Sequence, residues 1–297
     1  MSGLFWKPMK SDIAFKGTLR GTSYFVMVLI GAIFLTLLVG AMPAIKAFKI
    51  PFLYRSIWDP VKGDFGAGTF IAGTLLTSFT ALLISVPFSF SISIILGEYY
   101  KRGMLSQFLR IVVDLLASVP SVVYGLWGVA VLVPLIRRVE VFLGVTPYGV
   151  GILTTSLILA IMILPYSTSI AVEVIKLVPQ DLRYAGYGIG ATRMEVILGI
   201  VFPYARSGVL AGLLLSLSRA LGETMAVTMV IGNVVKMPDS IFSPGNTLAS
   251  IIASQFTESS GSLHLAAMIE LGLVLFVITT IINTVSHVVI MRLAKEK

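Results

Sequence analysis

Six long apolar runs constrain this chain more than any other feature of its sequence. Each covers about 20 residues or more, the length that an α-helix needs to cross roughly 30 Å of hydrocarbon. The runs lie at about residues 23–45, 70–96, 110–136, 148–172, 207–232 and 263–291. Composition agrees, because 57% of the residues are hydrophobic and only 12% are charged, against about 25% charged residues in soluble domains. The sequence therefore predicts an all-α, polytopic membrane protein with six transmembrane helices.

The first apolar run has two interpretations, because basic residues precede it as they precede a secretory signal. Its apolar part is longer than the roughly 7–15 residues of a signal-peptide core, so we expect a retained helix. On this interpretation the chain has a cytoplasmic N-terminal segment, residues 1–22, and a transmembrane domain, residues 23–297.

The distribution of Lys and Arg predicts the orientation in the membrane. Of the 22 basic residues, 14 fall in segments on the same side as the two termini and 7 on the opposite side. Because cytoplasmic loops carry the excess of basic residues, both termini are expected in the cytoplasm. The formal net charge of +8 is thereby explained by membrane orientation, and no nucleic-acid partner is expected.

Several kinds of chemistry lack their motifs in this chain. It contains no Cys and only two isolated His, too few for a multi-ligand metal centre. There is no Gly-Lys dipeptide, hence no phosphate-binding loop for ATP, and no metalloprotease or nucleophile-elbow pattern. We therefore expect no catalytic site, no metal and no cofactor on this chain, which leaves transport or channel activity.

A long inside segment, residues 173–206, carries the most specific motif. It contains Tyr184-Ala185-Gly186, then Gly190, then Ile200-Val201-Phe202-Pro203. This resembles the EAA motif of ABC importer permeases: Ala185, Gly190, Ile200 and Pro203 match it at the family spacing, whereas Tyr184, Gly186 and Phe202 depart from it.

The resemblance implies a type I ABC importer permease fold, in which this segment forms two short helices with a turn at the glycine and docks on a cytoplasmic ATPase. Arg193 is a predicted contact beside the motif, and Arg183 and Glu195 are candidates for its polar rim. Pro203 is expected to end the coupling element before the next span, because proline interrupts a helix.

Further segments are similar to the permeases of phosphate-specific Pst transporters, from about Ser56 to Leu293. They include Pro120–Gly128 and Ser218–Val227. Two permease types occur in these transporters, and the Trp127 in the first segment and the residues Gly222–Val227 in the second resemble the PstC type. The resemblance implies a PstA-like second permease subunit, a PstB-like ATPase dimer that carries ATP and Mg²⁺, a PstS-like extracytoplasmic phosphate-binding protein, and a place in the inner membrane of a bacterial or archaeal cell.

Two charged residues, Arg219 and Glu223, fall within the fifth apolar run. Each costs about 2.5–3.5 kcal/mol at a helix centre, so both are expected to face the bundle interior or a water-filled path. A guanidinium suits phosphate because its donors form a planar fork. Our hypothesis is that Glu223 holds and partly neutralises Arg219, so that phosphate binds weakly enough to leave; a structural ion pair is the alternative.

Other polar residues are weaker predictions. Thr224, Asn233 and Ser218 are expected to add hydrogen bonds along the path, although small polar residues also mediate helix packing. For Asp114 and Glu270 we expect anchoring at helix ends. Prolines inside the spans, Pro120 among them, are expected to bend helices without interrupting them.

Two outer connections are also informative. Residues 48–69 are expected to form an ordered loop anchored by aromatic side chains, and residues 247–256 to form a short re-entrant piece.

Alternatives remain open within and outside this class. The chain could be a PstA-type partner or an ABC permease for another solute, because the coupling motif is shared. A self-contained ion channel or secondary carrier would transport without an associated ATPase, and in an assembly scaffold Arg219 and Glu223 would affect stability alone.

Overall fold

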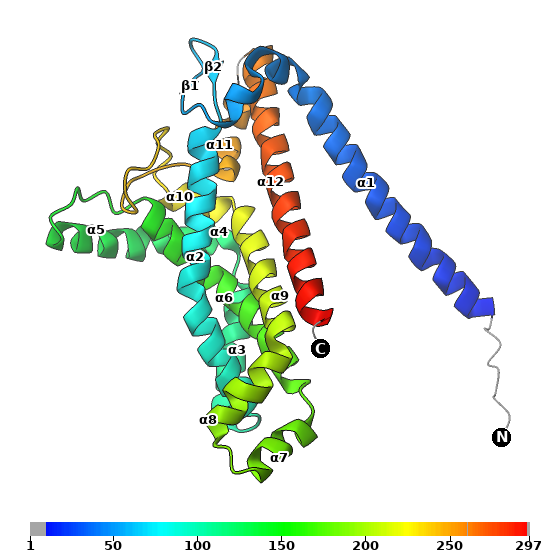
Figure 1. Ribbon diagram of the computed structural model, residues 1–297. Helices are drawn as coiled ribbons and strands as arrows, with labels where there is room; N and C mark the ends of the chain where they lie inside the picture. The colour runs from blue at the N-terminus through cyan, green and yellow to red at the C-terminus, as the bar shows by residue number, and fades with distance from the viewer. Residues whose placement is uncertain (1–9, 260, 296–297) are drawn as a thin grey trace.

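The computed structural model describes residues 10–259 and 261–295, and long helices dominate it (Figure 1). Helix α1 (Lys10–Phe48) already contains residues 10–22 of the predicted N-terminal segment, and residues 1–9 lie outside the described part. The 3-10 turn η1 (Ile50–Leu53) follows, then an antiparallel hairpin of β1 (Trp58–Asp59) and β2 (Asp64–Phe65). Helix α2 (Gly68–Ile94) returns along the bundle and ends in the π-helical turn η2 (Ile95–Tyr99).

The remaining elements alternate long spans with short connecting helices. In order they are α3 (Met104–Ser118), α4 (Ser121–Trp127), the π turn η3 (Gly128–Leu132), α5 (Val133–Phe142), α6 (Ile152–Lys176), α7 (Gln180–Gly188), α8 (Arg193–Val196), the π turn η4 (Ile197–Val201), α9 (Phe202–Leu221), α10 (Met225–Val230), α11 (Leu248–Gln255), η5 (Phe256–Glu258) and α12 (Ser262–Lys295). Six stretches of the described chain are long and apolar enough to cross a membrane, as predicted.

Helix α6 is the centre of the bundle, with α2 and α9 packed against it and α12 packed against α9. In the most apolar part of α6, 61% of the residues are buried, whereas in the most apolar part of α1 only 6% are buried. Helix α1 contacts α12 near the hairpin and then diverges from the rest of the molecule (Figure 1). Most of the α1 surface is therefore open to lipid or to another chain.

The end of the bundle that carries the hairpin is held by aromatic packing. The Trp58 ring contacts Phe65 and Phe70 edge to face at centroid distances of 4.8 and 5.2 Å, and its indole N–H donates to Gln255 Oε1 at 3.1 Å. The prediction of an ordered, aromatic-anchored loop is thus confirmed. The piece expected at 247–256 is helix α11, which Thr247 caps at its N-terminus.

The opposite end of the bundle carries α7 and α8, and the first residues of α1 and the last of α12 point toward this same end (Figure 1). That arrangement is expected for an even number of spans.

The third predicted span, residues 110–136, is not one helix. The chain leaves α3 at Ser118, Val119 is extended (φ −67°, ψ 128°), and α4 starts after Pro120. Proline has no N–H to donate and disfavours helical geometry in the residue before it, so the helix ends there. The apolar stretch long enough to span now runs over Ser121–Phe142. The expectation that Pro120 only bends a helix is wrong.

The fifth predicted span, residues 207–232, is also displaced. A continuous helical stretch runs over Arg193–Leu221 and stops at Gly222, and α10 begins only at Met225. Pro203 does not end the coupling element, because it lies in the first turn of α9, directly after the wider π turn η4. A π turn displaces the carbonyls that the proline ring would otherwise meet, which lets the helix continue.

Candidate functional site

The segment predicted to couple to an ATPase, residues 173–206, contains two short helices, α7 and α8, with a turn at Gly190. This glycine has φ +89°, a conformation that L side chains rarely adopt. Thr192 starts α8 with a capping box, in which its hydroxyl accepts from the Glu195 N–H while the Glu195 carboxylate accepts from the Thr192 N–H. The two-helix form that the EAA-like spacing implies is therefore present.

Small and apolar motif residues hold α7 against α8. A Cβ on Gly186 would lie 2.7 Å from Ile200 Cδ1 and 3.0 Å from Val196 Cγ2, so α7 approaches α8 as closely as a missing side chain permits. Ile200 packs on a buried cluster that includes Val196 and Val201. Gly186, a departure from the family pattern, thus has a packing reason.

A buried ion pair ties this loop to the end of the second span. Arg183 on α7 is 2% exposed and donates from Nε to Glu98 Oε1 at 2.8 Å; Glu98, in η2, is 6% exposed. The same guanidinium donates to the carbonyls of Ile175 and Val178. On its other oxygen Glu98 faces the Lys101 ammonium at 3.6 Å.

A second arginine reinforces the tie. Arg193 donates to the backbone carbonyl of Glu98, and its Cζ lies 4.0 Å from the centroid of the Tyr99 ring. The expectation that Arg183 contributes to a polar rim is wrong, because this side chain is buried and engaged inside the chain. Sequence reasoning also missed Glu98, whose one visible signal is a lone carboxylate at the end of an apolar run.

The α7–α8 loop exposes large apolar and aromatic side chains. They are Leu182, Tyr184, Tyr187, Ile189 and Met194. Beside them is a hollow of about 430 Å³ whose lining includes Gln180, Tyr184, Tyr187 and Arg193. Exposed apolar residues clustered at one surface are typical of a protein interface.

The second group of predicted residues lies at the break between α9 and α10, both of which pack on α6. Arg219 is in the last turn of α9, whereas Glu223 and Thr224 lie in the non-helical link after Gly222. The two charged residues therefore do not share a helical face. Thr224 accepts, through its carbonyl, from the N–H and hydroxyl of Thr228.

Arg219 stacks on an aromatic ring in place of the predicted carboxylate. Its Cζ lies 4.5 Å from the centroid of the Tyr166 ring on α6, and its side chain is exposed while that of Glu223 is half-buried. Among the described residues, no ion pair joins Arg219 to Glu223. The hypothesis that Glu223 holds Arg219 is not supported by this geometry.

The other predicted path residues have local partners. Ser218 bonds to Asn283 Oδ1 and so links α9 to α12. Asn233 has φ +52° and donates from Nδ2 to the Thr228 carbonyl at 2.8 Å, which closes the end of α10. Both contacts join elements around the break.

Asp114 and Glu270, the two acidic residues expected to anchor helix ends, differ in their surroundings. Asp114 is exposed on α3 and lines a hollow of about 190 Å³ with Arg110 and Glu173. Glu270 lies in the body of α12, is 6% exposed, and its Oε2 has no hydrogen-bond partner in the described part of the chain. The expectation of helix-end anchoring is wrong for Glu270.

Comparison with known families and proteins matches this architecture. Residues 89–295 match the family model described as binding-protein-dependent transport system inner membrane component. The chain is 40% identical to the phosphate transport system permease protein PstC of Pasteurella multocida, over 96% of this chain and 93% of that protein. It is 41% identical to the PstC protein of Mesorhizobium japonicum, over 95% and 91% of the two chains.

Among solved structures, the fold is similar to a chain of the MetNI methionine ABC transporter in an inward-facing conformation. The TM-score is 0.57 at 16% sequence identity, and the match covers 78% of this chain and 95% of that one. At this identity the likeness concerns the fold alone.

Proposed function

This chain belongs to the binding-protein-dependent transport system inner membrane components, and among them to the PstC phosphate permeases; on that premise we propose that its α7–α8 loop receives a separate ATPase and that Arg219 contacts phosphate in transit. The chain is a multi-pass membrane protein and a permease subunit of a phosphate ABC importer. In this proposal the coupling loop, the helix that leads away from it and Arg219 each contribute one step to transport.

Coupling rests on one observation: the loop is rigidly attached to the bundle on one side and open on the other. The Glu98–Arg183 pair fixes α7 to the end of α2, while Tyr184, Ile189 and Met194 remain exposed. An ATPase subunit that covers this apolar face would gain hydrophobic burial. We expect a PstB-like ATPase dimer to bind ATP and Mg²⁺ and to dock here.

The helix that starts at α8 continues without a break to Leu221, so a movement of α8 can be transmitted to the interruption at Gly222. The stretch Arg193–Leu221 contains 29 residues, a rod of about 43 Å at 1.5 Å per residue. A displacement of α8 by a docked ATPase therefore moves the opposite end of the rod, where Arg219 is found. Helical interruptions at Gly222 and Pro120 are the places where the outer segments can move separately.

The exposed guanidinium of Arg219 is the group we assign to phosphate. Stacking on Tyr166 occupies one face of the guanidinium, and its N–H donors lie in the plane of the group, free to meet an anion at the edge. Because Arg219 is exposed on this chain, a PstA-like second permease subunit is expected to complete the path.

Orientation follows the positive-inside distribution. We place the α7–α8 end, with both chain termini, in the cytoplasm, and the hairpin end on the side where a PstS-like binding protein delivers phosphate.

The test is phosphate uptake by a strain whose sole phosphate permease contains Arg219→Gln. Uptake should be abolished while the variant still inserts and still co-purifies with its ATPase. Arg138→Gln, a change of the same charge on α5, is the matched control and should transport normally. Normal uptake by Arg219→Gln would refute the assignment, and failure to recover any ATPase with the wild-type chain would refute the coupling scheme.

A further inference from the structure

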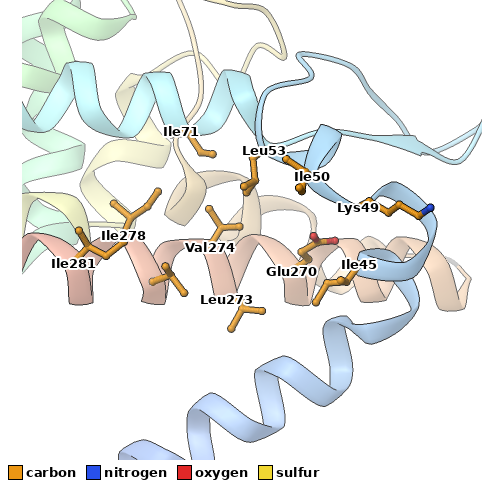
Figure 2. Close-up of a pocket in the computed structure, with 11 residues that line it drawn as sticks. Ile45, Lys49, Ile50, Leu53, Ile71, Glu270, Leu273, Val274, Ile278 and Ile281 are labelled. Atoms are coloured by element: carbon orange, nitrogen blue, oxygen red, sulfur yellow. The ribbon is translucent and has the colours of Figure 1, made fainter.

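A cavity of about 640 Å³ lies between α12, the end of α1, η1 and the start of α2, within the range of about 300–1,000 Å³ typical of ligand sites. Its walls are almost entirely aliphatic, and they include Ile50, Leu53, Val274, Ile278 and Ile281. Figure 2 shows two charged residues, Lys49 and Glu270, toward one end and Ile278 and Ile281 toward the other.

Glu270 is an acidic residue in the otherwise mostly aliphatic wall of this cavity, which we call the groove. Its side chain points from α12 toward the cavity (Figure 2), it is only 6% exposed, and Oε2 has no partner in the described residues. An unpaired buried carboxylate is costly. A ligand that donates a hydrogen bond at this position, ideally with a positive charge, removes that cost.

The depth of Glu270 matches a lipid headgroup. The spanning part of α12, Ser262–Leu293, has 32 residues, a length of about 48 Å, so if it is centred about 9 Å extends past the hydrocarbon at each end. Glu270 is eight residues into this helix, about 12 Å from its start, and thus close to the boundary between headgroups and hydrocarbon.

The length of the apolar wall matches one leaflet. From Glu270 to Ile281 is eleven residues along α12, about 16 Å, and half of the roughly 30 Å hydrocarbon layer is about 15 Å. An acyl chain whose headgroup is at Glu270 would follow this wall to the middle of the bilayer.

We propose that this groove binds a phospholipid with a primary ammonium headgroup, of the phosphatidylethanolamine class, in the leaflet on the hairpin side. Its ammonium donates to Glu270 Oε2, its phosphate accepts from the Lys49 ammonium, and an acyl chain fills the aliphatic wall. The opposite charges of Lys49 and Glu270 at one mouth complement a zwitterion, whereas an anionic lipid would meet the Glu270 carboxylate unfavourably.

The test uses the intact transporter, purified with its partner chains from nanodiscs that contain equal amounts of phosphatidylethanolamine and phosphatidylglycerol. Native mass spectrometry after mild delipidation reports which lipid stays bound. The wild type should retain phosphatidylethanolamine in about tenfold preference, the ratio that corresponds to about 1.4 kcal/mol. Glu270→Gln should retain both lipids equally, while Asp239→Asn, an exposed acid on the same side, should keep the preference.

Two further variants test the lipid site at residues other than Glu270. Lys49→Gln should weaken retention of both lipids, because both carry a phosphate, and Val274→Trp should displace both by filling the groove. Wild-type protein without retained lipid, the outcome expected if a partner helix fills the groove, overturns the proposal. An unchanged lipid preference in Glu270→Gln overturns it equally.

Discussion

Replacing Glu98 with Gln should destabilise the chain strongly, because Glu98 joins the end of the second span to the α7–α8 loop. In the proposed scheme it should also uncouple phosphate transport from ATP hydrolysis. Both side chains of the Glu98–Arg183 pair are within a few per cent of complete burial. Removing one partner of such a pair typically costs about 3–5 kcal/mol, since the other charge stays buried. Arg183 keeps its bonds to the carbonyls of Ile175 and Val178, so the expected cost is toward the lower end, about 3 kcal/mol.

A thermal melt of the purified protein in detergent measures the first effect. On the scale of roughly 2–4 °C per kcal/mol for domains of this general size, Glu98→Gln should melt about 6 °C or more below the wild type. The double variant Glu98→Gln with Arg183→Met should recover part of the loss, because it leaves no unpaired buried charge. Asp239→Asn breaks an exposed ion pair with Lys236 and is the control that should leave the melting temperature unchanged.

The ratio of phosphate transported to ATP hydrolysed distinguishes a positioning role of Glu98 from a contribution to stability alone. In proteoliposomes that contain equal amounts of assembled transporter, Glu98→Gln should lower the phosphate moved per ATP hydrolysed, since the loop can then shift without moving α2. A variant that was simply less stable would show less total activity at an unchanged ratio. A melting temperature within about 2 °C of wild type, or additive effects of the two single changes, would refute the reasoning.

Three further outcomes are expected from the fold. Gly190→Ala should weaken recovery of the ATPase in pull-downs, because alanine at φ +89° costs about 1–3 kcal/mol, whereas nothing lies within 4 Å to obstruct the new Cβ. Gly73→Ala should lower the melting temperature, because its Cβ would collide with the carbonyl of Asn246; a melt equal to that of wild type would contradict this close approach. Since the chain has no Cys, an impermeant maleimide should label Lys62→Cys on intact spheroplasts and Met104→Cys only after permeabilisation, and the reverse pattern would contradict the proposed orientation.

The general architecture could be predicted from the sequence because the bilayer allows few solutions. An apolar run of sufficient length must become a helix, since no water is present to bond a free backbone. The two-helix form of this loop was implied by the resemblance to the EAA motif, which Ala185, Gly190, Ile200 and Pro203 match at the family spacing.

The partners of the charged residues could not be predicted, because they depend on packing between distant segments. Glu98 and Arg183 are 85 residues apart, and each was visible alone as a charge near a helix end. For Arg219 the error came from assuming that helical spacing persists to Glu223. The helix stops at Gly222, so a spacing of four residues carries no information there, and Tyr166 on another helix is the actual neighbour.

The two prolines of opposite outcome show why interruptions are hard to place from sequence. Pro120 separates α3 from α4, whereas Pro203 lies within a helix that continues from α8 to Leu221. The difference is the π turn before Pro203, which provides the room that the ring needs. Had Pro203 ended the helix, a movement of the coupling loop would be absorbed at a hinge beside the membrane. Because it does not, the first interruption of the helix after α8 is at Gly222, and in the proposed coupling scheme a displacement of α8 is therefore carried along the helix to Arg219.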